Sequence, residues 1–246
     1  LFFTKKNKMI KHIKFLLILF FLICVKNHSQ ENMNIDFITG IEHNDLVGDS
    51  LKLESKTFFA FKKMEEAAKK DGIILKIVSA HRSFERQNFI WNKKYNKFTD
   101  EYSLNPMDAI NEIIRFSTIP GTSRHHWGTD IDIIDGKYPD ENNVLMSEKY
   151  EKGGIFYDLK KWLSNNSEKF GFFLTYNNDP KRKGFEYEPW HYSYKPSSKK
   201  YLKLLLNSDL EKLFKNKNLN GYQYFDKKFI DKYISEFIMD INPDLK

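Results

Sequence analysis

Histidine and acidic residues that could bind a metal ion gather in two short segments of this 246-residue chain. The first segment runs from Ser123 to Asp132 (SRHHWGTDID), and the second is EPWH, from Glu188 to His191. A catalytic zinc site takes three protein ligands and leaves one position for water. A further carboxylate near that water can act as a general base. The two segments together therefore offer the groups that metal-assisted hydrolysis needs.

The first segment contains more candidate ligands than one zinc ion requires. Residues 129–134 (TDIDII) begin with alternating polar and apolar side chains, which predicts a strand. On that strand Asp130 and Asp132 point to the same face, so the alternation does not choose between them. His125 is expected at the end of the preceding loop, and Gly128 lets the backbone turn sharply before the strand.

The spacing of these residues resembles a known family signature. Ser-x-His-x-x-Gly-x-x-x-Asp followed by Glu-x-x-His is similar to the motifs of the VanY-type D-alanyl-D-alanine carboxypeptidases. These are zinc peptidases whose fold is shared with lysostaphin-type peptidases and the hedgehog signalling domain. The resemblance implies that His125, Asp132 and His191 bind one zinc ion per chain and that Glu188 is the catalytic base.

A third segment fits the same family. Ser79–Gln87 (SAHRSFERQ) resembles the family's Tyr-Arg-Ser segment that ends in Gln. The resemblance implies that Arg82 stabilises charge on the substrate carbonyl, and that Gln87 and Ser123 lie near the substrate. The three motifs occur in the expected order and span about residues 55–194.

The chain departs from the family pattern at two positions. His81 stands where the family has Tyr, and Asp130 stands where the commonest pattern has Ala. The motif spacing selects Asp132 as the ligand and leaves the role of Asp130 open, with a partner that orients a histidine ligand as one hypothesis. His126 is expected to line the cleft or to pack, because its neighbour matches the motif. Trp127 and Trp190 are expected in the core or in the wall of the cleft.

Helices and strands are mixed without regular alternation, which predicts a single α+β domain. Its central sheet is expected to be largely antiparallel, to carry the zinc site and to be flanked by helices. Asn105 and Pro106 form a helix start, and Ser208 with Glu211 forms a capping box. The predicted helices are 55–70, 84–95, 106–116, 156–169 and 229–239, and the predicted strands are 73–79, 129–134, 172–176 and 185–194.

The basic charge of the chain lies mostly at its N-terminus. The formal net charge is +7, and residues 1–29 contain six lysines and no acid, so the remainder carries 7 − 6 = +1. This excludes a broad basic face and with it a nucleic-acid partner. A lysine-rich start followed by the apolar run Phe15–Val25 predicts a signal peptide over 1–29. Met9 is an alternative first residue. The alternative interpretation of the segment is an uncleaved membrane anchor.

Export has consequences for the rest of the chain. The single cysteine, Cys24, lies in the apolar run, so the mature chain has no disulfide and no thiolate ligand. Residues 30–246 are expected to form one peptidase domain with a helical extension from about 196. The protein is predicted to act in the periplasm or the cell envelope. Its predicted partner is the peptide of peptidoglycan, and it is expected to be a monomer.

The family resemblance leaves the substrate open among wall peptides. D-alanyl-D-alanine carboxypeptidase activity is the leading hypothesis. An L,D-carboxypeptidase or a peptidoglycan endopeptidase would share every motif. A non-catalytic zinc module that binds the wall is the third alternative, and the presence of Glu188 argues against it because a binding module needs no base.

Overall fold

The computed structural model describes residues 35–42 and 46–246, so the predicted signal peptide lies outside the described residues. A four-stranded sheet forms the centre, in the order β3 (Leu75–Ser79), β4 (Asp130–Asp135), β6 (His191–Tyr194) and β5 (Phe172–Leu174). All three pairings are antiparallel. A short antiparallel pair, β1 (Leu46–Val47) with β2 (Leu53–Glu54), lies apart from it. The predicted α+β fold with a largely antiparallel sheet is confirmed.

The register of β4 and β6 gathers polar side chains on one face of the sheet. Asp132 is paired with His191, and Asp130 is paired with Ser193. Directly opposed residues of neighbouring strands share a face, so these four side chains point to the same side. Ile131 and Ile133, which alternate with these aspartates, point to the other face, which is apolar.

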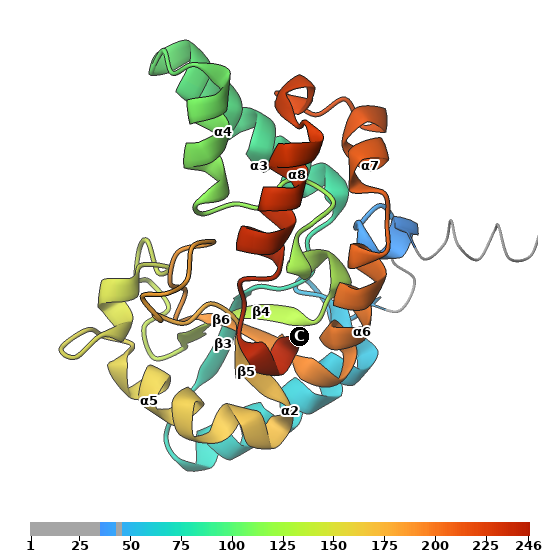
Figure 1. Cartoon of the computed structure of the whole chain (residues 1–246). Helices are drawn as coiled ribbons and strands as arrows, with labels where there is room; N and C mark the ends of the chain where they lie inside the picture. Colours follow the sequence, from blue (N-terminus) through green and yellow to red (C-terminus); the bar gives the residue numbers. More distant parts are fainter. Residues whose placement is uncertain (1–34, 43–45) are drawn as a thin grey trace, which may run out of the picture.

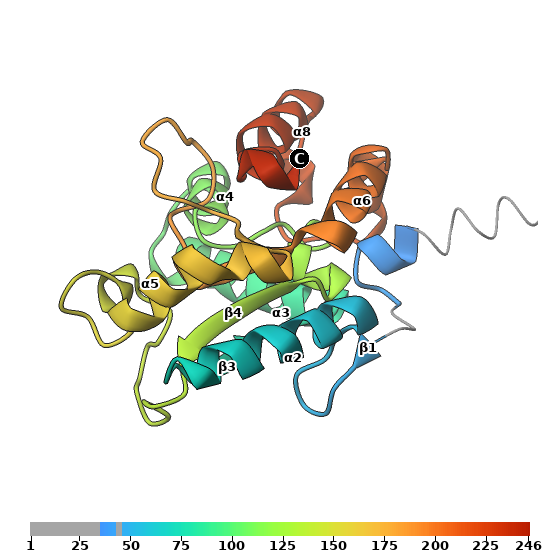
Figure 2. The same ribbon diagram turned by 90° about the horizontal axis from the view of Figure 1, so that it is seen from below.

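Two helices cover the apolar face: α2 (Ser55–Lys70) and α5 (Tyr157–Asn166). In α2 the buried positions recur at helical spacing, and the carboxylate of Glu54 caps the helix by accepting from the Thr57 backbone N–H at 2.9 Å. Figure 2 shows both helices running along the sheet. The core between helices and sheet contains Phe61, Met64, Ile131, Ile133, Leu159, Leu163, Phe172 and Tyr192.

Helices from both halves of the chain form a second core on the polar side of the sheet (Figure 1). They are α3 (Phe84–Asn96), α4 (Pro106–Ile114), α6 (Lys195–Leu206), α7 (Leu210–Asn216) and α8 (Lys227–Tyr233). Trp91 and Ile110 from the first half pack in one cluster with Leu205, Phe214 and Leu245 from the second half. The segment after residue 195 therefore completes a core that α3 and α4 cannot bury alone. No helix among the described residues is long and apolar enough to cross a membrane.

The last part of the chain also anchors a loop that leads to the first motif. The hydroxyl of Tyr233, at the end of α8, accepts a hydrogen bond from the backbone N–H of Ile119 at 3.0 Å. The same hydroxyl lies 2.9 Å from the Thr122 hydroxyl. Tyr233 is buried, so both bonds are shielded from water. The loop at 119–122 is thus held from the C-terminal side before it reaches Ser123.

Most predicted elements are present, and three predictions need correction. The strand predicted over 185–194 begins only at His191, because Glu188–His191 forms a turn in which the His191 N–H donates to the Glu188 carbonyl at 3.1 Å. The cap of α7 is Asp209, since the Ser208 hydroxyl instead donates to the carbonyl of Leu205. The last predicted helix is α8 followed by a π-helical segment, Ile234–Ile238.

Candidate active site

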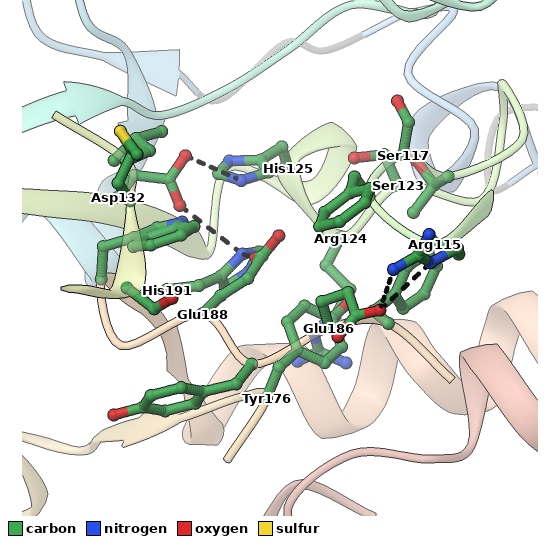
Figure 3. Close-up of a pocket in the computed structure, with 18 of the residues that line it drawn as sticks. Arg115, Ser117, Ser123, Arg124, His125, Asp132, Tyr176, Glu186, Glu188 and His191 are labelled. Atoms are coloured by element: carbon green, nitrogen blue, oxygen red, sulfur yellow. Dashed lines mark hydrogen bonds and ion pairs between the residues drawn. The ribbon is translucent and has the colours of Figure 1, made fainter. Parts of the chain in front are cut away.

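A cavity of about 600 Å³ opens beside the polar face of the sheet. It is lined by six of the residues that the motifs predict, namely Arg82, Ser123, His125, Asp132, Glu188 and His191. Figure 3 shows Asp132, His125, Glu188 and His191 grouped at one side of this pocket. Trp190 forms part of the wall, as expected, whereas Trp127 is buried in the core and donates to the carbonyl of Ile38.

The sequence did not predict the opposite side of the pocket. Arg115 lies there between two glutamates, 3.1 Å from Glu112 and 3.0 Å from Glu186. Phe116 and Met146 line the cavity and are exposed. These residues belong to loops and helix ends without a motif, so only the tertiary structure brings them to the site. An exposed rim with apolar and ionic groups suits a peptide better than a compact ion.

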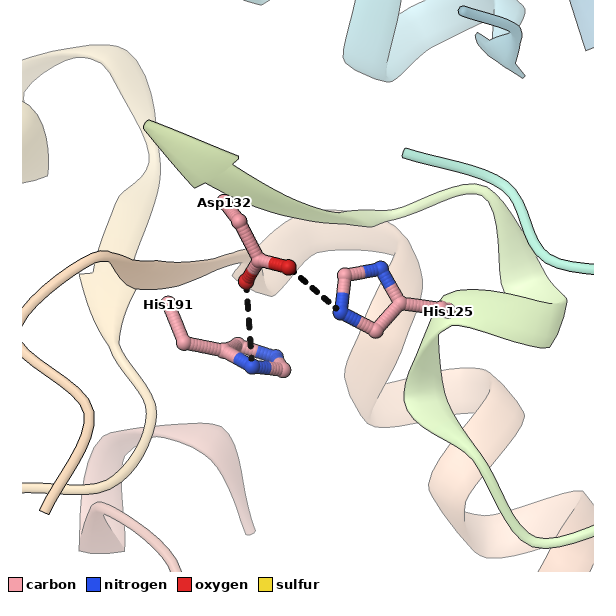
Figure 4. A group of neighbouring side chains, drawn as sticks. All are labelled: His125, Asp132 and His191. Carbon is pink, nitrogen blue, oxygen red and sulfur yellow. Dashed lines mark ion pairs between the residues drawn. The ribbon is translucent and has the colours of Figure 1, made fainter. Parts of the chain in front are cut away.

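Three predicted ligands converge in a buried group (Figure 4). The ligand atoms of His125, Asp132 and His191 all lie within 4.8 Å of one another. Nε2 of His125 is 3.5 Å from one carboxylate oxygen of Asp132, and Nδ1 of His191 is 3.5 Å from the other. Oδ1 of Asp132 is buried and has no hydrogen-bond partner. Two imidazoles and one carboxylate with an unsatisfied oxygen are a donor set that zinc accepts.

Local structure holds His125 in this position. It lies in the 3₁₀ turn Arg124–Trp127, which ends at Gly128 with φ +66°. A side chain at Gly128 would also meet the backbone nitrogen of Glu54 at 2.8 Å, so both conformation and space require glycine there. Nδ1 of His125 lies 2.8 Å from the carbonyl of Ala80 and must donate to it. That tautomer leaves the Nε2 lone pair directed towards Asp132.

His126 packs away from the cavity. Its Nδ1 lies 2.6 Å from the carbonyl of Arg82, and its Nε2 accepts from the Gly121 N–H at 3.1 Å. Burial lowers the pKa of His126 to about 3, so the ring is neutral with both nitrogens occupied. The Arg82 N–H in turn donates to the His125 carbonyl at 3.1 Å. These bonds tie the Arg82 segment to the histidine segment.

The guanidinium of Arg82 is held in place by its own motif. It donates to the Gln87 side-chain oxygen at 2.9 Å and to the Ser79 hydroxyl at 3.2 Å. Gln87 donates onward to the Thr118 carbonyl at 2.8 Å. Gln87 is fully buried and does not line the cavity, whereas Arg82 and Thr118, to which it is hydrogen-bonded, do. Burial lowers the pKa of Arg82, and the nearby carboxylates of Asp132 and Glu188 partly offset this.

Glu188 lies at the edge of the metal-binding group. One of its carboxylate oxygens is 2.9 Å from Nδ1 of His191, and its side chain is 18% exposed. It therefore lies beside both His191 and the open cavity. The turn from Glu188 to His191 creates this proximity, because it places the carboxylate beside the first residue of β6.

Asp130 lies on the far side of His191. Its Oδ1 is 3.1 Å from Nε2 of His191, which is the ring nitrogen that does not face Asp132. Burial would raise the pKa of Asp130, but Arg124 and the bond from His191 hold it well below its usual range. Burial would lower the pKa of His191, but its bonds to Asp130 and Glu188 raise it to about 10.

Metal-dependent hydrolases are the class that this geometry defines, because a His, Asp, His group opens onto a peptide-sized cavity beside a glutamate. Sequence comparison gives the family. A family model described as VanY, D-alanyl-D-alanine carboxypeptidase, matches residues 50–197, and the chain belongs to this family.

Individual relatives agree with this assignment. An uncharacterized protein of Haemophilus influenzae is 33% identical over 123 residues, which cover 49% of this chain and 93% of that protein. A D-alanyl-D-alanine carboxypeptidase of Enterococcus faecalis is 30% identical over 131 residues, or 52% of this chain and 43% of that enzyme. The chain thus spans less than half the length of the D-alanyl-D-alanine carboxypeptidases that it matches.

A solved structure agrees with the fold. The structure of VanYB in complex with D-alanine-D-alanine matches with a TM-score of 0.51 at 24% sequence identity. The match covers 66% of this chain and 84% of that one. Because the identity is low, this likeness supports the fold rather than the roles of individual residues.

Proposed function

We propose that this protein is a zinc-dependent D-alanyl-D-alanine carboxypeptidase that acts on the peptide stem of bacterial peptidoglycan. The buried group of His125, Asp132 and His191, with its unpartnered carboxylate oxygen, carries the proposal. The family membership and the D-alanyl-D-alanine carboxypeptidases among the relatives support the choice of substrate.

The residues around the cavity have separate roles in this proposal. Zinc, when bound, activates a water molecule and polarises the scissile carbonyl. Glu188 accepts the proton of the attacking water and gives it to the leaving amine nitrogen as the peptide C–N bond breaks. Arg82 donates hydrogen bonds to the carbonyl oxygen as negative charge develops on it. Ser123 lines the cavity and is placed to contact the substrate.

Product analysis tests the proposed function. The protein, loaded with zinc, is incubated with a muropeptide that carries a pentapeptide stem, and the product is identified by mass. Loss of one terminal D-alanine is expected, and a chelator should abolish it. Cleavage at another bond would favour an L,D-carboxypeptidase or an endopeptidase. Binding without any cleavage would favour a non-catalytic wall-binding module.

His125→Ala is expected to lose most of the bound zinc, because two remaining ligands hold the ion poorly. Metal content measured on purified protein checks this, with one zinc per chain expected in the parent. Asp130→Ala should still retain one zinc when zinc is in excess. If Asp130→Ala lost the metal and Asp132→Ala kept it, the ligand assignment would be wrong.

The proposed place of action is the cell envelope, where the peptide of peptidoglycan is found. The lysine-rich start and apolar run support export, although these residues lie outside the described part of the chain. The mature protein is expected to begin near Gln30. Mass measurement of protein isolated from its native envelope checks this, and a full-length cytoplasmic species would contradict it.

A further inference from the structure

A buried polar cluster lies behind His191, on the side away from the cavity. Asp130 is fully buried, and its Oδ1 accepts from Nε of Arg124 at 2.8 Å. Its Oδ2 accepts from the hydroxyls of Ser193 at 3.0 Å and Thr129 at 2.7 Å. Arg124 also donates to the Ser193 hydroxyl at 2.6 Å. Every oxygen of Asp130 is thus held in a fixed direction.

The same carboxylate determines which nitrogen of His191 can bind a metal. A neutral imidazole carries its proton on one nitrogen and a lone pair on the other. Nε2 of His191 faces Asp130 at 3.1 Å, so its proton is donated there. Nδ1 faces Asp132 and lies 2.9 Å from Glu188, so a metal ion binds at Nδ1 by displacing any proton held there, while Nε2 keeps its proton for Asp130. An anionic acceptor of this kind both orients a metal-binding histidine and makes it a better ligand.

The other histidine of the group lacks such a partner. Nδ1 of His125 donates to the backbone carbonyl of Ala80, which is neutral. The two imidazoles are therefore supported unequally, with the stronger support behind His191. An alanine at position 130, as in the commonest family pattern, would leave Nε2 of His191 without this carboxylate.

The free-energy cost of burying the Arg124–Asp130 ion pair indicates that the pair has a role in positioning its neighbours. Arg124 and Asp130 are buried, with side-chain exposures of 5% and 0%. A buried ion pair is often no more stabilising than apolar residues of similar volume, because both charges lose their hydration. The guanidinium is also held over the Trp127 ring at 4.8 Å, so Arg124 has little freedom to move. Such a rigid pair is suited to fixing the position of its neighbour.

We propose that Asp130, held by Arg124 and Ser193, is a positioning residue that fixes His191 with Nδ1 towards the metal and strengthens zinc binding. This inference rests on the proposed zinc site.

Zinc affinity, measured by competition with a chromophoric chelator at one pH, tests the inference. Asp130→Asn keeps the shape of the side chain but removes its charge. We expect this variant to bind zinc about 10- to 100-fold more weakly than the parent, the usual effect of losing such a partner. Asp135→Asn is the matched control, because Asp135 is a buried aspartate of the same strand that is not in the metal-binding group. Its zinc affinity should equal that of the parent.

A second measurement separates positioning from general stability. In the zinc-loaded parent, the Nε2–H proton of His191 should give a strongly downfield NMR signal, which moves upfield in Asp130→Asn but not in Asp135→Asn. Asp130→Ala leaves Arg124 buried without its partner, so its lower stability would add to the effect on zinc binding. The double variant Arg124→Met with Asp130→Ala removes both charges, so it should fold and show the same weakened zinc binding.

The outcomes distinguish this inference from the proposed function. Parent-like zinc affinity and an unmoved signal in Asp130→Asn would overturn the inference alone. Complete loss of zinc in Asp130→Asn but not in Asp132→Asn would make Asp130 a ligand and would also overturn it. If the parent binds no zinc or cleaves no wall peptide, the proposed function itself has failed.

Discussion

Glu188→Gln is expected to lower the rate constant of peptide hydrolysis by roughly two to four orders of magnitude, the usual contribution of a positioned acid–base group. Glutamine keeps the size of the side chain and most of its hydrogen bonding, but it cannot accept a proton at working pH. Zinc and peptide should bind about as well as in the parent, because Glu188 is placed beside the metal-binding group rather than within it.

Single-turnover kinetics, zinc content and peptide affinity together check this expectation. Glu186→Gln is the matched control, since it changes the same group two residues away, where the carboxylate is paired with Arg115. No comparable fall in rate is expected for it. Loss of zinc in Glu188→Gln would make Glu188 a ligand, and full activity would mean that another group transfers the proton.

Arg82→Ala is expected to lower turnover by roughly a hundredfold or more, by analogy with the loss of other donors to a developing oxyanion. The guanidinium lines the cavity and is fixed by Gln87 and Ser79, so its charge is already directed before a substrate arrives. Zinc content and folding should be unchanged, because Arg82 is not part of the metal-binding group.

Turnover, zinc content and circular dichroism of Arg82→Ala and Arg86→Ala check this prediction. Arg86 is a suitable control because it belongs to the same motif but is exposed and lies over the Phe89 ring. It should behave like the parent. Normal turnover in Arg82→Ala would remove this residue from the mechanism.

Local patterns in the sequence predicted several elements with nearly the observed bounds. The bounds of α2 agree with the amphipathic period of residues 55–70, and α4 begins at Pro106 with Asn105 as its cap. Both features depend on residues within one or two turns of each other, so the sequence contains them directly. The convergence of His125, Asp132 and His191 agrees with the family spacing, and the register of β4 and β6 gives its physical cause.

Features that depend on distant segments escaped prediction. The turn from Glu188 to His191 resembles a strand in sequence, because aromatic residues flank it on both sides. Gln87 lies behind Ser117 and Thr118, to which it donates hydrogen bonds, and of Arg82 and Gln87 only Arg82 lines the cavity. Arg124 and Ser193 lie within two residues of predicted ligands in sequence, yet only the tertiary structure shows that both donate to the Asp130 carboxylate.

Because Tyr233 anchors the loop at 119–122, the order in which the chain is synthesised determines when this loop is fixed. The three predicted ligands, His125, Asp132 and His191, precede Tyr233 in the sequence, so the ribosome synthesises them first. The loop that leads to His125 nevertheless gains its hydrogen bonds to the Tyr233 hydroxyl only when the end of α8 has been synthesised and has docked. The nascent chain therefore passes through a stage with every ligand present but with the segment before the first one unanchored. The position of the segment before His125 thus depends on a residue that is synthesised later than all three predicted ligands.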